Sequence, residues 1–81
     1  MNKIDKLNFD SVPSLWDKRE SLFKDNTVDL KDISSIDVSG MAILVKWAKA
    51  QKDQKLHLIN VPVSAMNLIN TYRLGQLFVL D

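Results

Sequence analysis

Cysteine is absent from this sequence of 81 residues, and histidine, glycine and proline are rare. Without cysteine the chain can form neither disulfides nor thiolate zinc sites, and it has no thiol nucleophile. The single histidine, His57, excludes a histidine-rich metal site, and two glycines are too few for a glycine-rich phosphate-binding loop. Stability therefore has to come from the hydrophobic core, and we expect neither a metal nor a cofactor.

A strong excess of one charge is also missing. The chain has 11 Lys and Arg against 10 Asp and Glu, for a net charge of +1, which argues against a nucleic-acid-binding protein. The longest apolar run, residues 41–45, is far shorter than the roughly 18 residues that suggest a membrane span. We also expect no signal peptide at its start. We therefore expect a soluble, cytoplasmic protein.

The small size also limits the chemistry. A domain of this length buries only about 60% of the surface that its unfolded chain exposes, which leaves little room for an enclosed active site. Ser39 has no histidine near it in the sequence, and acidic pairs such as Asp29 and Asp32 are spaced like ordinary surface charges. We expect no catalytic residues, so the sequence predicts a binding protein rather than an enzyme.

Hydrophobic periodicity predicts alternating strands and helices. The expected strands cover residues 7–9, 27–31, 55–60 and 77–80, and the expected helices cover 12–24, 39–53 and a last segment that begins at 61–62. The apolar stripes place Trp16 of the first helix and Tyr72 of the last helix on core-facing sides. This order predicts an α/β fold, with a mainly parallel or mixed sheet of about four strands and three crossover helices.

The most specific local feature is the turn Asp37-Val38-Ser39-Gly40, where the second helix begins. A helix N-terminus presents unpaired N–H groups and a positive dipole end, so it accommodates a capping side chain or a phosphate. Asp37 and Ser39 are both suitable capping residues, and the sequence leaves the choice between them open.

The same helix carries apolar residues on two sides. With 100° per residue, Met41, Leu44, Val45 and Ala48 form a core stripe, whereas Ile43 and Trp47 lie about 200° and 240° from Met41. Gly40, Ile43 and Trp47 could form an exposed apolar patch beside Ser39, as a protein interface would need. Alternatively, another element such as the last helix covers Trp47.

The segment 28–44 resembles the signature of STAS domains, which are found in bacterial anti-sigma-factor antagonists and in accessory domains of anion transporters. That signature is an apolar strand, a short loop, an Asp-(Ser/Thr)-(Ser/Ala)-Gly turn and an apolar helix. The resemblance covers roughly residues 5–80, and the expected order of elements agrees with it. Within the family, Leu15-Trp16-Asp17-Lys18-Arg19-Glu20 is most similar to the MlaB-type STAS subunit of the Mla phospholipid ABC transporter.

The resemblance implies a single STAS domain over residues 1–81, shortened by the first strand of its opening hairpin. It implies a non-catalytic cytoplasmic subunit that binds the transporter's ATPase subunit and stabilises or activates it. Such a subunit contacts the inner membrane only through that complex. A partner could cover the sheet edge left by the missing strand. The partner-binding residues that we expect, around the Asp37–Gly40 turn, are Val38, Ser39, Gly40, Ile43 and Trp47.

The turn also supports a second function. In antagonists the phosphorylated residue precedes the glycine, which corresponds to Ser39, whereas the transporter subunit has a threonine directly after the aspartate, where this chain has Val38. The alternative is therefore an anti-sigma-factor antagonist, switched by a kinase partner that phosphorylates Ser39. Both functions remain open on the sequence.

Overall fold

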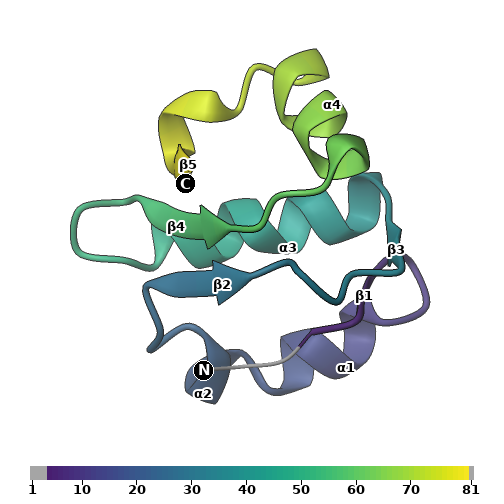
Figure 1. Cartoon of the computed structure of the whole chain (residues 1–81). Coiled ribbons are helices and arrows are strands. Elements are labelled where there is room, and N and C mark those ends of the chain that lie inside the picture. The colour runs from purple at the N-terminus through teal and green to yellow at the C-terminus, as the bar shows by residue number, and fades with distance from the viewer. Residues whose placement is uncertain (1–3, 81) are drawn as a thin grey trace.

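A computed structural model describes residues 4–80, and within them the chain forms five short strands and four α-helices (Figure 1). In chain order the elements are β1 (Lys6–Leu7), α1 (Val12–Asp17), α2 (Arg19–Leu22), β2 (Thr27–Asp29), β3 (Ser35–Ile36), α3 (Val38–Lys49), β4 (Leu56–Ile59), α4 (Val63–Thr71), the short 3-10 helix η1 (Gly75–Leu77) and β5 (Phe78–Leu80). The predicted α/β class is confirmed.

All strand pairs are parallel, but the strands form two separate sheets. One sheet has the order β2-β4-β5, and the other pairs β1 with β3. In the larger sheet Val28 lies opposite Leu58, and both are buried, whereas the neighbouring pair Thr27 and His57 is half-buried. This alternation gives the sheet one core-facing side, because successive side chains of a strand point to opposite faces.

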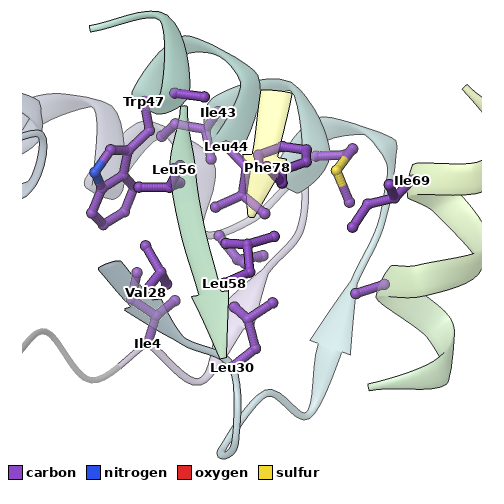
Figure 2. Close-up of a cluster of buried hydrophobic side chains, with 14 of the residues drawn as sticks. Ile4, Val28, Leu30, Ile43, Leu44, Trp47, Leu56, Leu58, Ile69 and Phe78 are labelled. Carbon is purple, nitrogen blue, oxygen red and sulfur yellow. The ribbon is translucent and has the colours of Figure 1, made fainter. Parts of the chain in front are cut away.

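Helix α3 covers the core-facing side of the sheet (Figure 1). Figure 2 shows Leu44 and Trp47 reaching from α3 toward the strands, where Leu56 and Leu58 complete the core. The segment that contains α1 and α2 packs on a second side of α3, and α4 contacts it from a third. Helix α3 is therefore the central element, and six of its twelve residues are buried.

Two differences from the sequence-based prediction change the number of elements, and several other elements are shorter than expected, among them α3, which ends at Lys49 rather than at residue 53. The helix expected over residues 12–24 is divided into α1 and α2 at Lys18. The Lys18 N–H donates to the carbonyl of Leu15, three residues back, instead of four residues back as in an α-helix. The segment expected to be an irregular loop contains β3, which pairs with β1 over Ser35 and Ile36. These differences raise the counts from about four strands to five and from three helices to four.

Candidate functional site

The turn at the start of α3 is held by Asp37. Its backbone is extended, and its Oδ1 atom accepts a hydrogen bond from the Gly40 N–H at 3.0 Å, so Asp37 rather than Ser39 is the N-cap. The other oxygen, Oδ2, accepts from the Phe9 N–H at 3.0 Å. These N–H donors stabilise the carboxylate and lower the pKa of Asp37 below its usual value. One side chain thus fastens the β1–α1 loop to the first turn of α3.

Gly40 has a steric role in the same turn. It is buried, and a Cβ atom at this position would overlap the backbone carbonyl of Leu7, which is the last residue of β1. A backbone atom cannot move aside as a flexible side chain can. The glycine therefore allows β1 to pass directly against the start of α3, and it is not available to a partner.

The predicted exposed patch of Gly40, Ile43 and Trp47 is wrong. Trp47 is only 1% exposed, its ring stacks on Phe23 with centroids 5.5 Å apart, and its Nε1 donates to the Asp25 carbonyl at 2.8 Å. Ile43 is buried as well. The segment after α2, rather than the last helix, covers this side of α3. Both stripes that the helical wheel separated are therefore largely buried, although Val45, which was expected in the core, is only half-buried.

Trp16 differs from the prediction in the opposite direction. It was expected in the core, yet 38% of its surface is exposed. Its ring meets Phe23 edge-on with centroids 6.2 Å apart, and the Arg19 guanidinium lies 4.4 Å from the ring centroid. The Lys46 ammonium approaches the same ring at 5.8 Å. Trp16 is therefore a surface residue that links α1 to the accessible side of α3.

Two shallow grooves flank this accessible side. The first, between α1 and α3, has a volume of about 260 Å³ and is lined by Val12, Trp16, Ser39, Ala42, Ile43 and Lys46. The second, between α3 and the segment that follows α4, has a volume of about 250 Å³ and is lined by Val38, Met41, Ala42, Val45, Tyr72 and Leu74. Ala42 belongs to both grooves, so its small side chain forms the ridge between them.

We call the accessible part of this surface the α3 face, and it consists of Trp16, Val38, Ser39, Ala42, Val45 and Tyr72. Val38 and Tyr72 are each 51% exposed, although Tyr72 was expected to face the core. Two cations, Arg19 and Lys46, border the face at Trp16, and neither forms an ion pair within residues 4–80. The face is thus apolar with a basic margin.

The structure brings together only part of the predicted site. Val38 and Ser39 lie on the α3 face, and Ile43 contributes to the floor of the first groove, but Gly40 and Trp47 are interior. Sequence reasoning missed Trp16 and Tyr72 as surface residues. A signal was available for Trp16, because four charged residues, 17–20, follow it directly and mark an exposed stretch.

A family model described as the Mlab STAS domain matches residues 5–80. The chain belongs to the STAS family. The match is to the MlaB type, and it confirms the resemblance carried by the segment 28–44 and by the first helix. No curated protein and no solved structure matches the chain. STAS domains are in general protein-interaction modules rather than catalysts, which agrees with the apolar α3 face.

Across residues 4–80, no helix combines the length and the hydropathy needed to cross a bilayer. Within the same residues, no three His, Cys, Asp or Glu side chains gather as a metal site would require.

Proposed function

We propose that this protein is a non-catalytic subunit of an Mla-type phospholipid ABC transporter, and that it binds the cytoplasmic ATPase subunit through the α3 face. The observation that carries the proposal is the α3 face itself: two apolar grooves beside a ridge, on an MlaB-type STAS domain, with an exposed aromatic residue on either side. Aromatic anchors at the centre of an interface dominate binding energies.

The chemistry of the face indicates what the ATPase surface should carry. Apolar side chains would fill the grooves on either side of Ala42, and acidic residues would pair with Arg19 and Lys46 at the margin. Charge pairs at the rim mainly speed association and select the partner, whereas the desolvated grooves supply affinity.

Binding would regulate the ATPase by population shift. A subunit that binds one conformation or assembly state of the ATPase more tightly than another moves the equilibrium by the ratio of the two affinities. A hundredfold ratio corresponds to about 2.7 kcal/mol, enough to convert a minor active state into the dominant one. This mechanism needs no catalytic group in the STAS domain.

The test is the affinity of the purified protein for the transporter ATPase, measured by calorimetry together with ATP hydrolysis. Trp16→Glu and Val38→Glu put a charge on the α3 face, and we expect each to weaken binding at least tenfold and to reduce the effect on hydrolysis. Val63→Glu is the matched control, because Val63 is 76% exposed but lines neither groove. Unchanged affinity in both face variants would remove this surface from the proposal.

The position of Ser39 favours a second candidate function, that of an anti-sigma-factor antagonist. Ser39 lines the groove between α1 and α3, so phosphorylation would place about −1.5 to −2 charges inside the docking surface. Incubation with a cognate kinase and intact-mass measurement, with Ser39→Ala as the control, distinguishes the two functions. A stable ATPase complex without phosphate on Ser39 would exclude the switch.

A further inference from the structure

The loop between β1 and α1 is a tightly bonded turn over residues 8–11. The Asn8 side chain accepts hydrogen bonds from the N–H groups of Asp10 and Ser11 at 3.1 and 3.0 Å. The Ser11 hydroxyl accepts from the Asn8 N–H at 3.0 Å and donates to the Lys6 carbonyl at 2.9 Å. The Asn8 amide also donates to the Ser35 hydroxyl at 3.0 Å, which ties the turn to β3. Side chains thus fix the conformation of this loop.

Phe9 stands within this turn, and 75% of its surface is exposed. Its backbone is held, since its N–H donates to the Asp37 carboxylate at 3.0 Å. Its side chain is not part of the hydrophobic core. Any residue other than proline could donate the same N–H, so the architecture of the turn explains Asn8 and Ser11 but gives no reason for an aromatic ring at position 9.

The turn adjoins the α3 face. Asp37, which holds Phe9, directly precedes Val38 of the second groove, and Val12, which follows the turn, lines the first groove. Phe9 lines neither groove, but its N–H bond to Asp37 places its backbone beside Val38, at the margin of the α3 face.

We propose that Phe9 is an anchor residue of this surface, inserted into an apolar pocket of the protein that docks on the α3 face. This inference rests on the proposed function and names the same ATPase subunit as the partner. Binding normally orders flexible loops at a free-energy cost, and a turn that is already rigid avoids most of that cost. A preorganised aromatic ring at the margin of an apolar face is the kind of residue that becomes a binding hot spot.

The first experiment measures the dissociation constant of the full chain for the transporter ATPase, with Phe9→Ala as the test variant. We expect the affinity to fall at least tenfold, with the thermal midpoint of unfolding unchanged because the ring is exposed. Phe9→Leu should retain part of the affinity, since a pocket that takes an aromatic ring still accepts an apolar side chain. Val63→Ala, an equally exposed apolar truncation outside both grooves, should leave the affinity unchanged.

A second experiment tests whether the rigidity of the turn matters. Asn8→Ala removes the acceptor for two N–H groups of the turn and keeps Phe9. We expect it to weaken binding several-fold in the parent chain but not further in the Phe9→Ala background, because a loosened turn then has no anchor to present. Equal losses in both backgrounds would contradict preorganisation as the reason for the turn.

The outcomes for the two proposals are distinct. If Trp16→Glu weakens binding and Phe9→Ala does not, Phe9 is not an anchor, whereas the α3 face remains the docking surface. If Phe9→Ala, Trp16→Glu and Val38→Glu all leave the affinity unchanged, the α3 face is not the docking surface and this inference fails with it. If the parent chain does not bind the ATPase at all, the proposed function itself fails.

Discussion

The two tryptophans occupy contrasting environments, although both contact Phe23. Trp47 is enclosed, with its indole N–H bonded to the Asp25 carbonyl, whereas Trp16 is 38% exposed and carries two cations near its ring. Phe23 separates an interior side of α3 from its accessible side. The contrast shows that the segment following α2 decides which part of α3 is core and which part is available to a partner.

The largest expected effect is at the enclosed tryptophan. Trp47→Ala removes a fully buried ring and leaves the Asp25 carbonyl without its indole donor, so it should lower the free energy of unfolding by about 3–5 kcal/mol. Urea denaturation followed by circular dichroism measures this loss. Trp47→Phe is the control, because it keeps most of the packing. A loss below about 1 kcal/mol for the alanine variant would mean that Trp47 is not the core residue described here.

The same contrast explains what the sequence could predict. Strands β2, β4 and β5 and helix α3 follow from local periodicity, because the apolar spacing within each element is a property of neighbouring residues. Strand β3 does not, since it forms only through its pairing with β1. The cover over Trp47 is not local, since it comes from Phe23 and Asp25, more than twenty residues earlier in the chain. A helical wheel shows on which sides of a helix the apolar residues lie, but it does not show which of those sides another segment will bury.

The sequence predicts only part of the candidate site, because the rest depends on contacts between segments that are distant in the chain. Asp37 and Gly40 were recognised as a special turn, but their roles depend on Leu7 and Phe9, which the fold places beside them. Val38 and Ser39 were expected at the surface of the turn, and their positions on the α3 face agree with this. Trp16 borders them on one side and Tyr72 on the other. These neighbours depend on how α1 and α4 pack against α3, which local sequence patterns do not predict.

A smaller effect on stability is expected at the exposed tryptophan. Trp16→Ala loses the edge-on contact with Phe23 and the cation–π contact with Arg19, each worth on the order of 0.5–1 kcal/mol. We expect the free energy of unfolding to fall by about 1 kcal/mol, well below the loss at Trp47, and the affinity for the ATPase to fall at least tenfold. Thermal unfolding and calorimetry of one preparation give both values. A stability loss as large as that of Trp47→Ala would abolish the distinction between the two tryptophans.

The smallest effect is a local response to acid at the accessible end of α3. The pKa of Asp37 is lowered in the folded protein by the N–H groups of Gly40 and Phe9, so its stabilising contribution is complete above the ordinary aspartate value of 3.8 and is lost as the pH falls through the lower folded pKa. Asp29 behaves in the same way through Asn60 and Lys31, so a global unfolding curve would combine both groups.

Amide hydrogen exchange by NMR separates the contributions of Asp37 and Asp29. On acidification the Phe9 and Gly40 amides should lose protection before the Trp47 indole N–H does, and Asp37→Asn, which still caps the helix but cannot titrate, should remove this pH dependence. If the two amides and the indole lost protection together at every pH, the turn would open only with the whole core, and the two sides of α3 would form one cooperative unit.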